Sequence, residues 1–205
     1  MITQDNFEAD INNLDALGQM IKLKPAENFE GGTVLLMPGT LGPPLHSHPQ
    51  QDKLFKVIQG ELEVLKGKKW FTLKAGDKIL VPRKTTHSFR NTSTEVVVFD
   101  FAVTPKIGLT YLLLTIDELV KARKIVSRKK IWSLLYLNKV MAAYPSIIQG
   151  VNQPKWVVKL LSLIGTLLGM SIGQEKFRAE FLRPVEHWKR RCSKPAEAFI
   201  EEALF

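Results

Sequence analysis

Short apolar segments separated by turn residues run through the first half of the chain. Residues 33–37, Thr-Val-Leu-Leu-Met, lie between Gly31-Gly32 and Pro38-Gly39. An apolar segment of this length between turn residues is typical of a buried strand. Similar segments recur at residues 54–58, 61–65, 70–73, 79–81 and 96–103. A series of short strands with regular turns predicts an antiparallel sandwich or barrel.

Two stretches outside this series have helical spacing. Near the N-terminus, apolar residues within 5–20 predict a short helix or an irregular arm packed on the barrel. After Pro105, apolar residues recur at three and four positions, which predicts helices over about 109–120 and 129–143 and a third after Pro154. Phe177, Phe181 and Trp188 mark a fourth helical stretch. In the third helix the polar and small residues form one narrow stripe, so we expect a helix packed into the core.

These patterns predict a mainly β chain with an α-helical addition. We expect an N-terminal arm over residues 1–24, a β-barrel over 25–104 and an α-helical extension over 105–205. The extension is expected to pack on the barrel or on a second subunit, which favours a homodimer. The third helix is too apolar to stand alone in water.

Composition places this 205-residue chain among soluble globular proteins, since 45% of its residues are hydrophobic and 24% are charged. The single cysteine, Cys192, excludes an intramolecular disulfide and fits a reducing compartment. Acidic residues precede the first basic one, which is not the pattern of a secretory signal. Residues 160–174 form the longest strongly apolar stretch and are shorter than a spanning helix. We therefore expect a cytoplasmic protein.

Charge is divided unevenly along the chain. Residues 1–103 hold 12 basic and 12 acidic residues, whereas residues 104–205 hold 17 basic and 8 acidic ones. The basic runs at 121–124 and 128–130 can bind phosphate groups or an anionic membrane surface. The alternative is a solvated helix face, which we prefer at this stage. The sequence contains no nucleic-acid motif, so no nucleic-acid partner is expected.

Three histidines are the clearest candidates for chemistry. His46 and His48 lie two positions apart, so on a strand their side chains share a face. His87 follows within a second turn-rich stretch. Imidazoles that share a site can hold zinc, iron, nickel or copper.

The surroundings of these histidines resemble the two motifs of the cupin superfamily, whose members are small β-barrels that hold a metal. The first motif has His-x-His, four residues, Glu, six residues and Gly; here Lys53 replaces the Glu and Gly60 is in place. The second has Gly, five residues, Pro-x-Gly, two residues, His, three residues and Asn. Here it runs from Gly76 to Asn91, with Lys84 in place of its second Gly.

The resemblance implies a cupin barrel, also called a double-stranded β-helix, with His46, His48 and His87 as metal ligands. The helical tail is similar to that of the quercetin-dioxygenase-like cupins, so a metal-dependent dioxygenase or related oxygenase is the enzyme alternative. A binding module or sensor is the other alternative. No catalytic residue is assigned.

Lys53 is the informative departure from the family pattern. An ammonium about 4 Å from a divalent cation costs on the order of 8 kcal/mol at an effective dielectric near 20. Lys53 therefore weakens metal binding if it faces the histidines. Two alternatives stay open: its amine reaches out to water, or it points inward to pair with a carboxylate or enolate.

Phe55 and Val57 share strand parity with Lys53, and Phe89 shares it with His87. They are predicted either to line an apolar pocket or to form ordinary core. Together these residues favour a protein that binds a small anionic organic molecule.

Overall fold

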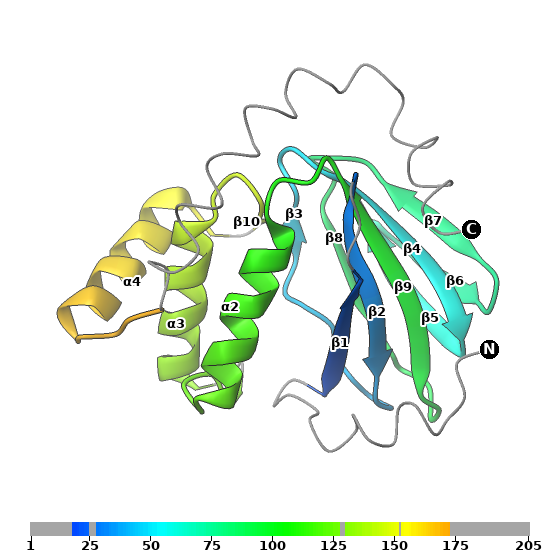
Figure 1. Ribbon diagram of the computed structural model, residues 1–205, viewed down its shortest axis with the longest axis horizontal. Helices are drawn as coiled ribbons and strands as arrows, with labels where there is room; N and C mark the ends of the chain where they lie inside the picture. The colour runs from blue at the N-terminus through cyan, green and yellow to red at the C-terminus, as the bar shows by residue number, and fades with distance from the viewer. Residues whose placement is uncertain (1–17, 25–27, 128–129, 152, 173–205) are drawn as a thin grey trace.

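Two five-stranded antiparallel sheets face each other in the computed structural model (Figure 1), which describes residues 18–24, 28–127, 130–151 and 153–172. The first sheet has the order β1 (Gln19–Lys24), β2 (Glu30–Leu36), β9 (Val97–Thr104), β4 (Asp52–Gln59) and β7 (Lys78–Val81). The second has the order β10 (Gln149–Gly150), β3 (His46–Ser47), β8 (His87–Arg90), β5 (Glu61–Lys66) and β6 (Lys69–Lys74).

The core between the sheets comes from alternate residues of their strands. Phe55, Val57 and Phe99 from one sheet and Leu62 and Val64 from the other are at most 1% exposed. Alternation along a strand sends every second side chain to the same face, which is why these apolar positions meet. The mainly β fold with a helical addition is as predicted.

Turns between the strands need backbone conformations that most residues avoid. Gly60 (φ 79°) joins β4 to β5, and Gly76 (φ 93°) lies between β6 and β7. Lys84, with φ of 65°, takes the same left-handed conformation although it is not a glycine. Glycine adopts this conformation without the steric cost that Lys84 carries, which explains why the cupin motif has Gly at this position.

Within residues 105–172, apart from the few undescribed positions, three helices follow the last long strand: α2 (Leu109–Lys121), α3 (Ile131–Ala143) and α4 (Lys155–Leu167). In Figure 1, α2 lies nearest the sheets and α4 lies farthest from them. The helix farthest from the sheets is also the least buried. Four residues of α2 and four of α3 are buried, but Gly165 is the only buried residue in the described part of α4.

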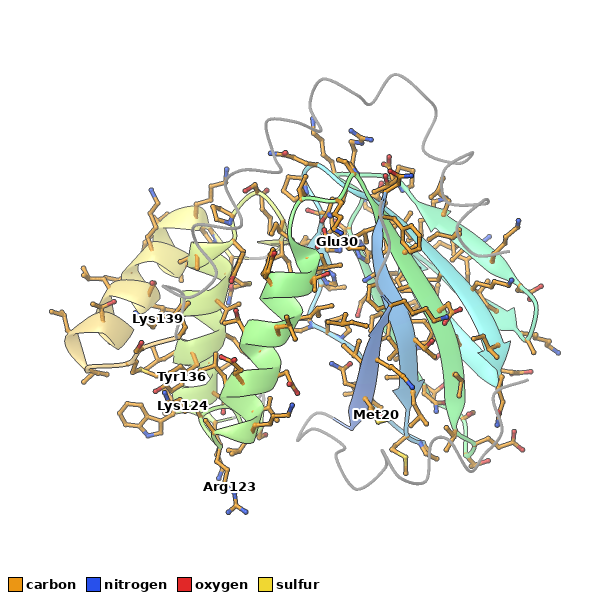
Figure 2. All side chains as sticks on the ribbon, in the orientation of Figure 1. Met20, Glu30, Arg123, Lys124, Tyr136 and Lys139 are labelled. Carbon is orange, nitrogen blue, oxygen red and sulfur yellow. The ribbon has the colours of Figure 1, made fainter. Side chains whose placement is uncertain are left out.

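Glu30, at the start of β2, fixes the beginning of α2. One carboxylate oxygen accepts hydrogen bonds from the backbone N–H groups of Ile107 (2.9 Å) and Gly108 (2.8 Å), and the other accepts one from Thr110 (2.8 Å). The side chain is 3% exposed and lies beside the first turn of α2 (Figure 2). A carboxylate at a helix N-terminus satisfies donors that have no partner within the helix. Glu30 thus joins the barrel to the extension.

A second junction lies at the other sheet. The two residues of β10 pair with β3, so that Gln149 faces Ser47 and Gly150 faces His46. Val151 also donates its backbone N–H to the Leu45 carbonyl (3.2 Å). The extension therefore supplies the edge strand next to His46.

The sequence pattern found the long elements and missed the short ones. Each apolar segment predicted as a strand lies largely within a strand, and the three helices begin and end close to their predicted limits. It did not identify β1 or β10, and β3 and β8 entered only through the strand parity assumed for the histidines and Phe89. Gln19 and Met20, at the end of the predicted N-terminal helix, belong to β1; the rest of that helix, except Gly18, and the fourth helical stretch lie outside the described residues. Among the helices that are described, none is long and apolar enough to cross a membrane.

Candidate metal centre

The three histidines meet inside the barrel. His46 lies on β3 opposite His87 on β8, and His48 follows two residues after His46. Each offers a ring nitrogen within 4.8 Å of those of the other two. The side chains are buried, with exposed fractions of 4%, 2% and 1% for His46, His48 and His87. The geometric expectation that the three imidazoles converge on one point is therefore met.

Each imidazole is oriented by a backbone carbonyl. Nδ1 lies 2.8 Å from the Pro44 carbonyl in His46, 2.6 Å from the Ile147 carbonyl in His48, and 3.0 Å from the Thr85 carbonyl in His87. A carbonyl only accepts hydrogen bonds, so Nδ1 carries the proton and donates it in each case. Nε2 is then left with its lone pair, which is the form that binds a metal.

The Nε2 atoms of His48 and His87 are buried and have no hydrogen-bond partner among the described residues. A buried polar atom without a partner costs about 1–3 kcal/mol, so such atoms are rare without a reason. Three neutral imidazoles with close ring nitrogens fit a divalent transition metal, which nitrogen ligands bind at about 2 Å. The donor set thus suits a metal ion.

Electrostatics keep these histidines neutral. Burial, followed by the charge of Lys53, lowers the pKa of His46 from 6.5 to about 4. The same two causes, together with His46, lower the pKa of His48 well below its usual value. Burial and then the neighbouring His46 and Lys53 also depress the pKa of His87. At neutral pH all three rings are therefore available as ligands without first losing a proton.

Lys53 points into the barrel. Its side chain is 7% exposed, and Nζ lies 4.9 Å from the ring centre of Phe55, 5.2 Å from that of Phe101 and 5.7 Å from that of Phe89. The alternative in which the amine reaches out to water is therefore wrong. That alternative failed because alternation on β4 directs Lys53 to the same side as Phe55.

Burial lowers the pKa of Lys53 from 10.5 to about 7. The charged form is disfavoured because few water molecules can solvate it inside the barrel. The aromatic rings partly offset this, since a cation near a ring face is stabilised by about 0.5–2 kcal/mol. Near neutral pH the amine can therefore be either charged or neutral.

The predicted lining residues form a cluster of aromatic rings next to the histidines. Phe55 lies 6.3 Å from the His87 ring and 5.8 Å from the Phe89 ring, measured between ring centres. Phe99 packs against both phenylalanines. Phe55 and Val57 are fully buried, at 0% and 1% exposed, and Phe89 is 6% exposed. All three residues belong to the hydrophobic core between the sheets.

Two neighbouring polar residues have structural roles. Asp52 faces away from the histidines and binds Arg83 through the backbone N–H (2.7 Å) and the guanidinium (2.7 Å). Asn91 is fully buried and donates Nδ2–H to the carbonyls of Leu36, Met37 and Glu95. The two residues fix loops at opposite ends of the first sheet, since Asp52 pairs with Thr104 at the end of β9 and Leu36 pairs with Val97 at its start.

Sequence reasoning missed two groups that support the site. The Ile147 carbonyl, 99 positions from His48, holds that imidazole. Lys84 donates its backbone N–H to the His48 carbonyl (2.8 Å). Backbone groups leave no mark in a pattern of side chains, so no signal was available for either. Phe101 was also missed, although its strand had been predicted and its side-chain alternation could have indicated it.

Comparison with known proteins points to one family. Residues 32–104 match the cupin domain family model. Over 64 residues the chain is 45% identical to the protein named oxidoreductase iacF of Pestalotiopsis fici, which covers 30% of this chain and 31% of the relative. Over 47 residues it is 45% identical to the uncharacterised protein YdbB of Bacillus subtilis, which covers 22% of this chain and 42% of the relative.

Among solved structures, the cupin domain of Schizosaccharomyces pombe Cnp3 is similar, with a TM-score of 0.41 and 22% sequence identity over 43% of this chain and 61% of that one. The matches to the two curated relatives span less than half of each relative's length. The residues that match the family model, 32–104, run from β2 to the end of β9.

Proposed function

We propose, from the premise that residues 32–104 belong to the cupin superfamily, that this barrel holds a divalent metal ion and binds a small organic acid beside it. The observation that carries the proposal is the pair of buried Nε2 atoms on His48 and His87 that have no hydrogen-bond partner in the described part of the chain. His46 would complete the ligand set.

A bound ion would supply Lewis acidity and open coordination positions for an oxygen ligand. The chain itself contributes the rest. The carbonyls of Pro44, Ile147 and Thr85 fix the imidazole rings, and the neighbouring phenylalanines exclude water. Such a mixture of an apolar wall and a few convergent polar groups is typical of small-molecule sites.

We assign to Lys53 the binding of the organic acid's carboxylate or enolate. In its charged form it is a buried cation near three histidines that stay neutral, and a carboxylate or enolate would balance it. The same charge opposes the metal, which explains why an anionic ligand suits the site: it interacts favourably with both cations. Ligand binding would also raise the pKa of Lys53 back towards its usual range.

An oxygenase is the second candidate. The histidine set is complete, and one relative carries the name oxidoreductase, which supports this alternative. Oxygen uptake by the metal-loaded protein with quercetin as a probe separates the two candidates. Uptake above that of His87→Ala favours the oxygenase, and binding without uptake favours the binding protein.

Metal titration tests the centre itself. Protein purified without chelator should contain a transition metal by elemental analysis. His87→Ala should weaken zinc binding by at least ~100-fold, because one of three ligands is lost. Lys53→Glu should tighten it by about tenfold or more by removing a repelling charge. Exposed Lys68→Glu is the matched control. Unchanged affinity in His87→Ala would refute the metal centre.

Binding of benzoate to the metal-free protein, for which the Lys53 pKa is about 7, tests the role of Lys53. Below pH 7 Lys53 carries its charge, and above pH 7 it loses it, so benzoate should bind more tightly at pH 6 than at pH 8.5. Lys53→Met should abolish most of this difference. Equal pH dependence in the variant and the wild type, measured by calorimetry, would exclude Lys53 as the anion partner.

A further inference from the structure

One side of α4 presents large apolar side chains to solvent. Trp156 is 67% exposed, Leu163 55% and Leu167 79%. Leu160 and Ile164 belong to the same set, and the spacing of three and four places all five on one side of the helix. We call these five residues the open face. Scattered exposed apolar residues are ordinary, but a contiguous set marks an interaction surface.

The open face is not the side by which α4 packs. Gly165 is buried against α3, where an added Cβ would lie 2.9 Å from the Lys139 side chain. Val158 and Leu161 are half-buried on the same side. At about 100° per residue this packed side lies roughly opposite the open face. The expectation of a helix packed into the core is therefore wrong: within the described residues, α4 packs by one side on α3 and contributes no residue to the hydrophobic core.

Lysines border the open face. Lys155 and Lys159 are exposed and form, with Ser162 and Thr166, the polar stripe between the open face and α3. Long lysine side chains can extend along apolar surface and keep the ammonium in water. An amphipathic helix with lysines beside tryptophan and leucine is typical of helices that lie in a membrane interface.

A basic cavity lies beside the C-terminal end of α4, where Leu168 follows Leu167 of the open face. It has a volume of about 460 Å³, and Leu168, next to Leu167, lines it together with Trp132, Tyr136, Arg123, Lys124 and Lys130. Figure 2 shows Lys124 beside Tyr136, with Arg123 extending from the end of α2. Lys130 is also the N-cap of α3, whose first turn contains no acidic residue. Cations at the positive end of a helix favour a bound anion.

We propose that the open face and the basic cavity together dock the protein on an anionic phospholipid bilayer. The leucines and Trp156 would enter the acyl boundary, and the cavity would take a phosphate headgroup. Exposed tryptophans suit this depth, because the ring is apolar and the indole N–H is polar. The docking is peripheral, since the helix lies along the surface.

Charge favours the bilayer over a second copy of the chain. Residues 104–172 hold 10 basic and 2 acidic residues. Two copies joined through the open face would bring two such basic regions together, which opposes association. A surface of phosphatidylserine offers the opposite charge and attracts each nearby lysine or arginine. This inference is independent of the metal centre, so either can fail without the other.

Co-sedimentation of the full-length protein with vesicles tests the proposal. The protein should pellet with vesicles that contain about one third phosphatidylserine and stay in solution with pure phosphatidylcholine. Leu163→Gln/Leu167→Gln should weaken binding at least tenfold by removing apolar insertion. Arg123→Gln/Lys124→Gln/Lys130→Gln should weaken it at least tenfold, and added salt should do the same to the wild type.

The matched control is Lys68→Gln/Lys69→Gln/Lys74→Gln, which removes three exposed charges from the barrel and should change binding less than threefold. Unfolding curves identify variants that fail to fold. A wild-type protein that stays in solution with anionic vesicles overturns the proposal, as does an equal loss in the control. A dimer that depends on Leu163 and Leu167 in sedimentation velocity would assign the open face to a second copy instead.

Discussion

The barrel and the helical extension depart from the usual distribution of polar and apolar side chains in opposite ways. The barrel buries three imidazoles and an amine in an aromatic interior. The extension leaves tryptophan and leucine side chains on its outer surface. Buried polar groups and exposed apolar patches are the two informative exceptions in a folded protein. The cluster of buried imidazoles and amine lies in the barrel, and the contiguous exposed apolar side lies on α4.

The difference lies in how far each region is complete without a partner. In the barrel, every imidazole is held on its Nδ1 side, and what is missing is a group at the point where the ring nitrogens converge. In the extension, α2 and α3 bury residues on their inner sides, whereas one whole side of α4 has no packing partner among the described residues. The convergent imidazoles in the barrel suit a small ligand, and the uncovered side of α4 suits an extended surface.

The largest effect on stability is expected where the two regions join. Glu30→Ala leaves three backbone N–H groups at the start of α2 without their acceptor. Because buried donors lose a charged partner, the free energy of unfolding should fall by about 3–5 kcal/mol. Urea unfolding of the metal-free protein, followed by circular dichroism, measures this.

Glu61→Ala is the matched control, because Glu61 is half exposed and pairs with Lys74 at 3.4 Å. Its loss should stay below about 1 kcal/mol. If Glu30→Ala instead gave two transitions, with the barrel unfolding at the wild-type urea concentration, the two regions would be independent and the junction would not couple them.

A smaller effect is expected at two non-glycine residues that, in the part of the chain the structure describes, have a left-handed backbone, one in each region. Lys84 has φ of 65° and Arg123 has φ of 55°. Lys84→Gly and Arg123→Gly should each raise the free energy of unfolding by about 0.5–1 kcal/mol, since glycine removes the steric cost. Lys69→Gly, within β6, should lower it by a similar amount. A loss of stability in Lys84→Gly would show that the lysine side chain makes stabilising contacts of its own.

The smallest effect is expected on the open face. Leu163→Gln and Leu167→Gln, measured singly by urea unfolding, should change the free energy of unfolding by less than about 0.5 kcal/mol, because exposed positions contribute little. Leu112→Ala, at a position on α2 that is 2% exposed, should cost about 2–5 kcal/mol. A loss above about 1 kcal/mol at Leu163 would mean that the open face is covered in the free protein, and the contrast between the regions would weaken.

Much of the barrel follows from local patterns in the sequence. Apolar alternation places the long strands, and the spacing of His46, His48 and His87 within two motifs brings the imidazoles together. Lys53 is the instructive case. The alternation of side chains along β4 places Lys53 inside the barrel, whereas the solvation of a charged amine favours an outward position. The structure has the inward position, with Lys53 7% exposed.

The remainder could not be read from the sequence, because it depends on which distant segments meet. The two-residue strands β3 and β10 are too short to show a periodicity. Glu30 looks like an ordinary polar residue before a strand, and its role depends on the position of α2. The open face of α4 was expected to be buried within the protein. An apolar pattern predicts that one side of a helix is buried, but it does not identify the surface that covers it.

The hydrogen bond from His48 to the Ile147 carbonyl bears on how this protein can be divided or transplanted. The segment that matches the cupin family model ends at residue 104, whereas the group that fixes one of its imidazoles lies 43 residues further on (147 − 104). A barrel cut at the family boundary would keep all three histidines but lose the edge strand that pairs with the His46 backbone and the carbonyl that orients the His48 imidazole. A fragment that keeps the site intact must therefore extend through β10. The domain boundary given by sequence similarity is shorter than the segment that the site requires.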